Sequence, residues 1–193
     1  MRNAVRALGS RNFRLFFVGQ TISLIGTWMT RLAISWLVYR LTGSAFLLGV
    51  AGFAGQIASF FAAPLAGVWV DRWDRHRTLV LAQVLSMIQS LALAALAFSG
   101  VLNIWSITAR ASCQGLINSF DMPARQSYLI EMVENRGDLA NAIALNSSMV
   151  NLTRLIGPAL AGMVIAATGE AWCFLIDGIS YIPVIFSLLA MTR

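Results

Sequence analysis

The sequence predicts an all-α membrane protein, and three features of it support this class. Residues 41–70 and 78–109 contain no Asp, Glu, Lys or Arg, and each run exceeds the roughly 20 residues that cross about 30 Å of hydrocarbon. The chain of 193 residues is 58% hydrophobic and only 11% charged, with a mean hydropathy of +0.73. A soluble domain of this size needs a far more charged surface. The runs also lack the alternation of barrel strands, so helices are the expected spanning element.

Six segments are expected to cross the membrane, and arginines indicate their direction. The segments are roughly residues 15–39, 44–69, 78–99, 104–121, 140–167 and 171–191. Residues 1–14 are basic and lack a cleavage site, which favours a cytoplasmic lead-in over a signal peptide. Residues 121–139 form the only long polar stretch and are expected to be a central inner loop. With the N-terminus inside, only Arg40 lies near an outer end, as the positive-inside rule requires. Ten arginines then lie on the cytoplasmic side: Arg2, Arg6, Arg11, Arg14, Arg72, Arg75, Arg77, Arg125, Arg136 and Arg193.

A dense group of charges at residues 67–77 separates the two longest apolar runs. This position predicts a short loop that turns a helical hairpin at the cytoplasmic face. Three of its arginines lie within a few residues of both spans: Arg72, Arg75 and Arg77. Asp71, near the end of the earlier span, is expected to accept hydrogen bonds from a helix N-terminus or to pair with Arg75. His76 is expected to be a passive residue in a solvated loop.

Four charged residues lie inside the expected spans: Arg31, Arg110, Arg154 and Asp177. Each is costly in hydrocarbon, so each is expected to face a cavity or a partner. Arg154 lies about 21 Å along the helix from the inner end of its span, near the midplane. Three cations and one anion do not balance. The excess charge either meets acids in a second bundle or attracts an anionic or polar substrate. Alternatively, Asp177 pairs with one arginine while Arg31 and Arg110 extend to the outer headgroups.

Several motifs resemble the major facilitator superfamily of secondary transporters. Gly67-x-x-x-Asp71-Arg72-x-x-Arg75-x-Arg77 resembles its loop signature, with Asp74 and His76 in place of the usual glycine and arginine. Asp74 is shared with the macrolide-efflux and siderophore-exporter branch. Gly157-Pro158-x-x-x-Gly162 resembles the antiporter signature of drug exporters. Glycines let helices approach closely, and proline allows a bend. Residues 120–126, 141–158 and 174–177 resemble the same branch.

This resemblance covers essentially the whole chain and implies the N-terminal half of a major facilitator fold. Such a half is a six-helix bundle of 3+3 inverted repeats. The stretches 63–67 and 157–162, each with a proline followed by a glycine, weakly echo that repeat. The resemblance implies a multi-pass protein of the bacterial inner (cytoplasmic) membrane that exports a drug-like or siderophore-like molecule. Export is expected to be proton-coupled antiport, by alternating access against a C-terminal six-helix bundle.

The resemblance also implies roles for particular residues. The gating loop, which latches the inner face, comprises Gly67, Asp71, Arg72, Arg75 and Arg77. In the competing interpretation these residues only orient the hairpin. The antiporter-like motif comprises Gly157, Pro158 and Gly162. The candidate substrate and proton pathway comprises Arg31, Arg110, Asn151, Arg154 and Asp177. Arg110 resembles an arginine in span four of proton-driven exporters, although Gln114-Gly115 stands one residue too far from it.

Two alternatives from other classes remain at this stage: a half-size carrier acting as a homodimer, and a non-transporting truncated membrane protein or scaffold. No phosphate loop, Ser-His-Asp pattern or zinc-ligand pattern occurs, so we expect no enzyme activity, cofactor or metal. The net charge of +6 would ordinarily suggest nucleic acid. The arginines border apolar runs instead, so the expected partners are membrane lipid, a small-molecule substrate and the proton. A further expected partner is the missing C-terminal six-helix bundle or a second copy of this chain.

Overall fold

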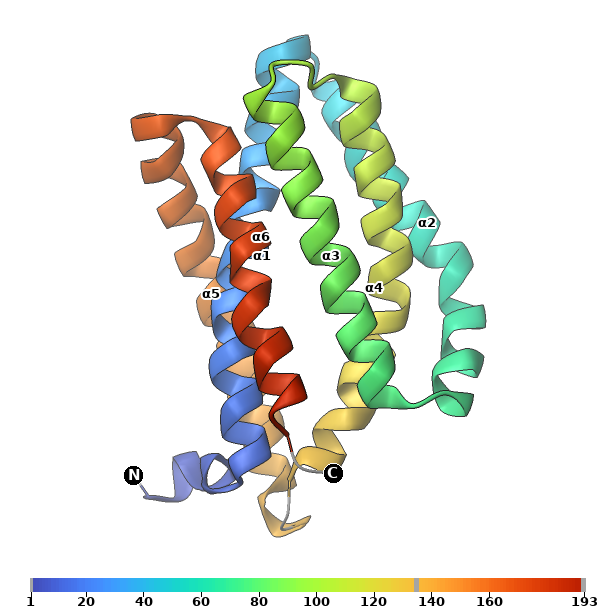
Figure 1. Ribbon diagram of the computed structural model, residues 1–193, viewed down its shortest axis with the longest axis vertical. Coiled ribbons are helices and arrows are strands. Elements are labelled where there is room, and N and C mark those ends of the chain that lie inside the picture. The colour runs from blue at the N-terminus through green and yellow to red at the C-terminus, as the bar shows by residue number, and fades with distance from the viewer. Residues whose placement is uncertain (1, 134–135, 192–193) are drawn as a thin grey trace.

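The computed structural model describes residues 2–133 and 136–191, without the side chains of residues 2–5, 71 and 136. In these ranges the chain forms six long helices and no strand (Figure 1). The helices are α1 Arg11–Thr42, α2 Ala45–Arg72, α3 Arg75–Phe98, α4 Ile104–Met132, α5 Leu139–Thr168 and α6 Glu170–Leu189. Two short 3-10 helices, η1 Arg2–Gly9 and η2 Arg136–Asp138, precede α1 and α5. The predicted all-α class is confirmed for the described residues.

The helix ends follow from local sequence. Gly43 has a φ of 61° and closes α1, a left-handed conformation that glycine adopts without steric cost. The Ser44 side chain then accepts from the Leu47 amide and begins α2. Asn103 and Ser106 form a reciprocal capping box at the start of α4. Most connections are therefore short, and consecutive helices run antiparallel.

Asp74 caps α3, and this cap is open to a direct test. Its carboxylate accepts from the Arg77 amide at 3.1 Å. Replacing Asp74 with Ala is expected to destabilise the protein by about 1 kcal/mol, because one N-terminal amide loses its acceptor. Asp74→Ser retains an acceptor and should lose less. Denaturant unfolding of the purified protein in detergent compares the two; equal losses would show that the cap contributes nothing.

The largest difference between expectation and structure is in α4. The expected span ends at residue 121, but the helix continues to Met132 through much of the stretch expected to be a loop. Its buried residues recur at helical spacing in that stretch: Asp121, Ala124, Tyr128, Leu129 and Met132. This spacing describes an amphipathic helix, which buries its apolar side in the core. Because residues 121–132 are polar in composition, the sequence did not indicate that they continue the helix. The other five helices begin and end within four residues of the expected spans.

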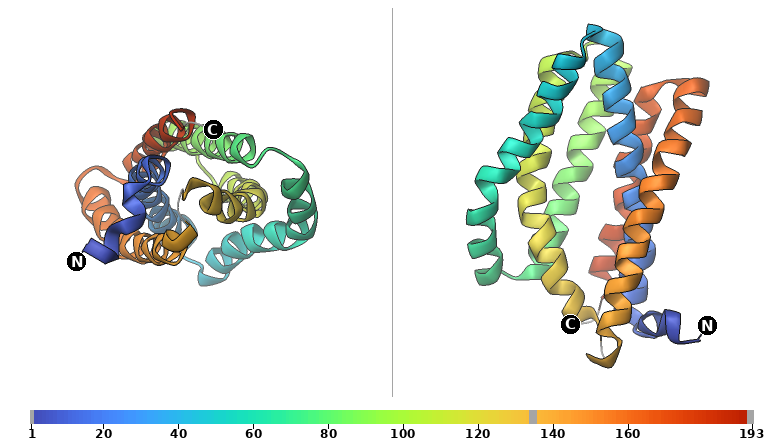
Figure 2. Two further views of the ribbon diagram at one scale, coloured as in Figure 1. Left: turned by 90° about the horizontal axis from the view of Figure 1, so that it is seen from below. Right: turned by 180° about the vertical axis from the view of Figure 1, so that it is seen from behind.

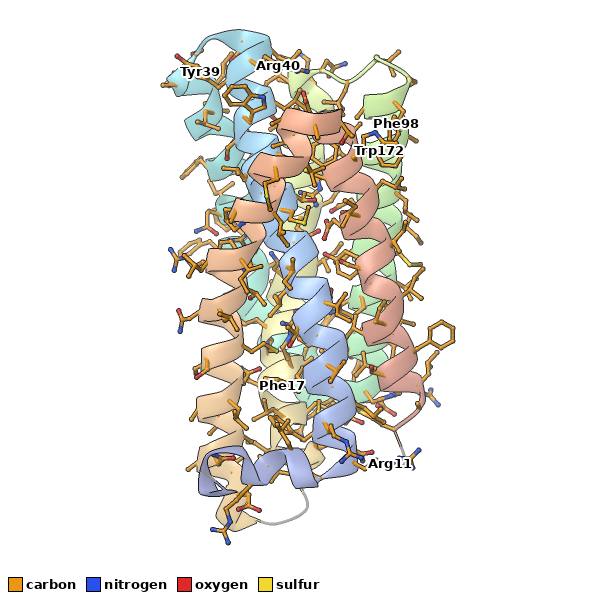
Figure 3. All side chains as sticks on the ribbon, turned by 90° about the vertical axis from the view of Figure 1, so that its left-hand side faces the viewer. Arg11, Phe17, Tyr39, Arg40, Phe98 and Trp172 are labelled. Carbon is orange, nitrogen blue, oxygen red and sulfur yellow. The ribbon has the colours of Figure 1, made fainter. Side chains whose placement is uncertain are left out.

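The chain crosses the bundle six times, so that its first and last described residues lie at one end (Figure 1). The α2–α3 turn and the α4–α5 connection lie at this same end, which we call the terminal end. Arg40 and Tyr39 lie at the opposite end from Arg11 (Figure 3). There Arg40 forms an ion pair with Glu170, whose side chain is almost fully buried. That pair joins the last turn of α1 to the first turn of α6.

The helices are packed unequally. α1 lies against α5 and α6, and α3 lies against α4 and α6. α2 packs mainly along α4 and leans away from the other helices towards the terminal end (Figure 2). In the apolar 18-residue stretch of α2, only 6% of the residues are buried within the structure, against 44% in the corresponding stretch of α6. Two hydrophobic clusters form the core, one containing Phe13, Leu79 and Leu188 and one containing Met29, Ile107 and Phe174.

Five helices of the described chain are long and apolar enough to cross a membrane, namely α1, α2, α3, α5 and α6. α4 does not meet this criterion. Its side chains include Arg110, Gln114, Asn118, Asp121 and Arg125. Each of these makes a hydrogen bond or ion pair within the bundle. Arg110, Gln114 and Asp121 are bonded to neighbouring helices, whereas Asn118 and Arg125 are bonded to other residues of α4.

Candidate functional site

A buried ion pair joins α4 and α6. Asp177 on α6 is fully buried and accepts a hydrogen bond from the hydroxyl of Ser90 on α3. A terminal nitrogen of Arg110 lies 3.9 Å from the Asp177 carboxylate and 3.4 Å from the Ser90 oxygen. Asp177 is therefore paired with one arginine, Arg110. Arg110 does not extend to a headgroup, since only 12% of its side chain is exposed.

Small residues permit this close arrangement. A Cβ added at Gly26 of α1 would lie 2.9 Å from the Asp177 Cα, closer than side-chain carbons approach backbone. Thr27, one residue along α1, is within 3.2 Å of the Tyr181 hydroxyl on α6. The Asp177 carboxylate is thus enclosed by α1, α3 and α4. Its charge is compensated within the bundle.

A second group of charged residues lies on α1 and α5 and has a different environment. The guanidinium carbon of Arg31 lies 4.6 Å from the centre of the Trp28 ring, and that of Arg154 lies 5.4 Å from it. Both distances are within the range of cation–π attraction. Both arginines are exposed, and no ion pair within the described ranges includes either of them.

Gly157 brings α5 to α1 beside this tryptophan. A Cβ at Gly157 would lie 2.5 Å from the Trp28 Cβ and 3.0 Å from the Ile25 carbonyl oxygen. Gly157 therefore lies where α5 approaches α1 closely, as a packing role for this glycine requires. Gly162 differs, because no atom of the described structure lies within 4 Å of its hypothetical Cβ. Within the described bundle Gly162 makes no such close approach, and its packing role stays a prediction. Pro158 lies inside α5 without ending it.

Asn151 completes the residues predicted to line a pathway. It is exposed on α5, and its side-chain amide donates to the Ser147 carbonyl oxygen at 2.9 Å. It precedes Arg154 by three residues, so the two lie on neighbouring positions of one helix face. The predicted pathway residues therefore lie in two places. Arg31 and Arg154 both lie against Trp28, and Asn151 is one turn from Arg154. Arg110 and Asp177 are paired inside the bundle.

The α2–α3 turn at the terminal end is more strongly tied to the bundle than expected. Arg75 forms an ion pair with Glu131 of α4. The capping carboxylate is that of Asp74, which also lies 3.7 Å from Arg77. The Asp71 side chain, which was expected to cap a helix N-terminus or to pair with Arg75, lies outside the described side chains. Gly67 and Arg72 are on the last turns of α2, and Arg72 is exposed.

His76 is not the passive residue that was expected. Its Nε2 lies 2.7 Å from the Leu188 carbonyl oxygen, so this nitrogen donates to the last turn of α6. The imidazole also packs edge-on against the Tyr128 ring, with 5.6 Å between centres. His76 therefore joins α3, α4 and α6. The sequence alone did not indicate this, because the partners are far away in the chain.

Several polar partners were missed, and one pattern in the sequence marks them. Gln83, Ser86 and Ser90 interrupt the apolar run of α3 at helical spacing, and all three are buried. Gln83 donates to Asp121 of α4 at 2.7 Å, and Asp121 also pairs with Arg125. A polar stripe on an apolar helix predicts such interhelical hydrogen bonds. Trp28, the ring between two arginines, has no comparable signal.

Comparison with known proteins gives consistent matches. A family described as transmembrane secretion effector matches residues 3–193. The staphyloferrin A transporter of Staphylococcus aureus is 25% identical over 87% of this chain and 42% of its own length. The multidrug efflux pump Tap of Mycolicibacterium fortuitum is 30% identical over 75% of this chain and 36% of its own. Macrolide efflux protein A of Streptococcus pyogenes is 25% identical over 79% and 37%.

The chain spans less than half the length of these relatives. Its match to the family, however, includes almost every residue. The motifs at residues 67–77 and 157–162 agree with this assignment. The chain belongs to the transmembrane secretion effector family of the major facilitator transporters.

Proposed function

We propose that this chain is the amino-terminal six-helix bundle of a bacterial exporter that moves a drug-like or siderophore-like molecule outward. The observation that supports this most is the placement of charge. Arg110 of α4 forms a buried pair with Asp177 of α6. Two exposed arginines, Arg31 and Arg154, lie on α1 and α5, which are long and apolar enough to span a membrane. Charges are retained within membrane segments chiefly where they serve a pathway. Relatives whose names describe macrolide efflux, multidrug efflux and staphyloferrin A transport support the class of cargo.

In this proposal α4 is the sixth span, and hydrogen bonds and an ion pair to α3 and α6 offset part of the cost of its polar groups. The bundle occupies residues 15–191, after a cytoplasmic lead-in at 1–14, and is built of two inverted repeats of three helices. The terminal end faces the cytoplasm. The distribution of arginines supports this orientation, because Arg72, Arg75 and Arg77 lie at that end.

The exporter works by alternating access against a C-terminal six-helix bundle. The residues of the gating loop, Gly67 to Arg77, brace the inward-closed form, and the pair of Arg75 with Glu131 holds that loop to α4. Gly162, with no neighbour in the described bundle, contacts the other bundle. Asp177 takes up the coupling proton, because a carboxylate that pairs with Arg110 in one state can be released from it in another.

A transport assay tests this proposal. Inside-out membrane vesicles from a host that expresses the complete native gene product are given an acid interior, and uptake of a radiolabelled macrolide and of staphyloferrin A is measured. We expect uptake of at least one compound, its loss when an ionophore collapses the gradient, and its loss in Asp177→Asn. Ser99→Ala, an exposed change at the end of α3, is the matched control. Uptake of neither compound, or uptake indifferent to the gradient and to Asp177, would contradict the proposal.

A further inference from the structure

We propose that Arg31 and Arg154, both held against Trp28, form a binding site for the carboxylate group of an anionic cargo. This inference names the class of cargo and rests on the proposed export function for the fate of the ligand. Binding itself is measured without transport. The ligand class is a small molecule that carries at least one carboxylate beside an apolar body.

The depth of Arg154 in its helix argues against pairing with a lipid headgroup. Arg154 lies about half way along the 30 residues of α5, and Arg31 about two thirds of the way along the 32 residues of α1. At a rise of about 1.5 Å per residue, Arg154 is roughly 20 Å from either end of its helix. Lipid headgroups at the membrane surface do not reach this depth. A counter-charge must come from within the membrane layer.

The bundle does not supply that counter-charge. Asp177, the buried acid at this level, is engaged with Arg110 and Ser90. Arg31 and Arg154 have no acidic partner in the described part of the chain. Because both guanidinium groups lie against the same ring, their like charges repel each other. Cations in a low-dielectric layer gain strongly from an anion placed between them. An anion bound there also removes the repulsion between α1 and α5.

The indole ring makes these cations suitable for binding instead of structural pairing. A guanidinium that stacks on an aromatic ring keeps its N–H edge free, and that edge matches the two oxygens of a carboxylate. Trp28 is half-buried, and its Cβ lies so close to Gly157 that a Cβ added there would come within 2.5 Å of it. The ring therefore holds Arg31 of α1 and Arg154 of α5 in place before a ligand arrives. The half-buried indole also offers an apolar surface to the body of the ligand.

Equilibrium dialysis with 2-naphthoate and its neutral amide, 2-naphthamide, tests the site on the complete native product in detergent. The two probes have the same shape and differ in charge. We expect saturable binding of naphthoate and at least tenfold weaker binding of the amide. Arg31→Gln and Arg154→Gln should each weaken naphthoate binding at least tenfold, and Arg154→Lys should weaken it less than Arg154→Gln. Arg14→Gln, which removes an exposed charge from the same helix α1, should leave naphthoate binding unchanged.

Absent naphthoate binding, equal binding of both probes, or binding unaffected by either glutamine variant would each overturn the site. Thermal unfolding of every variant confirms that the protein is folded, and Arg154→Lys retains the charge in case Arg154→Gln does not fold. Failure of export is a separate result. A protein that binds naphthoate through these arginines but moves no compound would overturn the proposed function and keep the site. If both glutamine variants still export and the protein binds no naphthoate, the binding site would be overturned and the proposed function would be kept.

Discussion

Asp177→Ala is expected to destabilise the bundle by about 3–5 kcal/mol, the range found when one partner of a buried ion pair is removed. Asp177 is fully buried, and only 12% of the Arg110 side chain is exposed. Removing the carboxylate leaves the arginine charge inside the bundle without compensation, and it also leaves the Ser90 hydroxyl without its acceptor. Denaturant unfolding of the purified protein in detergent measures this loss.

A double variant separates the charge effect from loss of packing. In Arg110→Gln with Asp177→Asn, two neutral amides of similar size replace the ions, so no uncompensated charge remains. This protein should be more stable than either single variant, although removal of two groups from one network rarely adds simply. If Asp177→Ala were as stable as the wild type, or if the double variant were the least stable of all, the pair would not have the role that its burial indicates.

Gly157→Val is expected to have the second large effect, on both stability and binding. Its new Cβ would lie 3.0 Å from the Ile25 carbonyl oxygen and 2.5 Å from the Trp28 Cβ. The first of these is a backbone atom, so α1 and α5 must move apart. Such overpacking typically costs about 1–3 kcal/mol. The separation also draws Arg154 away from Trp28, so naphthoate binding should fall at least tenfold.

Gly162→Val provides a matched control on the same helix. It carries the same β-branched side chain and the same change in helix propensity, but nothing in the described structure lies within 4 Å of its Cβ. Unfolding of the isolated 193-residue chain in detergent should show a smaller loss for Gly162→Val than for Gly157→Val. Equal losses would mean that the Gly157 contact with Trp28 has no special weight.

The sequence predicts the helices well where composition changes sharply. The charges at residues 67–77 follow an apolar run, and α2 and α3 end and begin within three residues of the expected positions. α4 is the exception. The residues after 121 are polar enough for a loop, yet Ala124, Leu129 and Met132 bury a stripe that only the arrangement of the neighbouring helices reveals. Composition predicts which segments cross a membrane, but it does not predict that a helix continues beyond such a segment.

The candidate site was predictable as a set of residues and not as a geometry. Charges within apolar runs single out Arg31, Arg110, Arg154 and Asp177, because each requires a partner. Which partner each finds depends on contacts between helices distant in sequence. Asp177 is 67 residues from Arg110, and Arg154 is 126 residues from Trp28. Likewise, Gly157 and Gly162 look equivalent in the motif, but only Gly157 faces a neighbouring helix within this bundle.

The mass of the native product in its own host membrane tests whether this chain is one of two bundles of an exporter. An antibody against the N-terminal segment detects the product after electrophoresis. We predict a band at about twice the 21.0 kDa of this chain, because the relatives are more than twice as long as the part that matches. A band at 21.0 kDa would contradict the proposal, and would instead favour a half-size carrier acting as a homodimer or a non-transporting membrane protein.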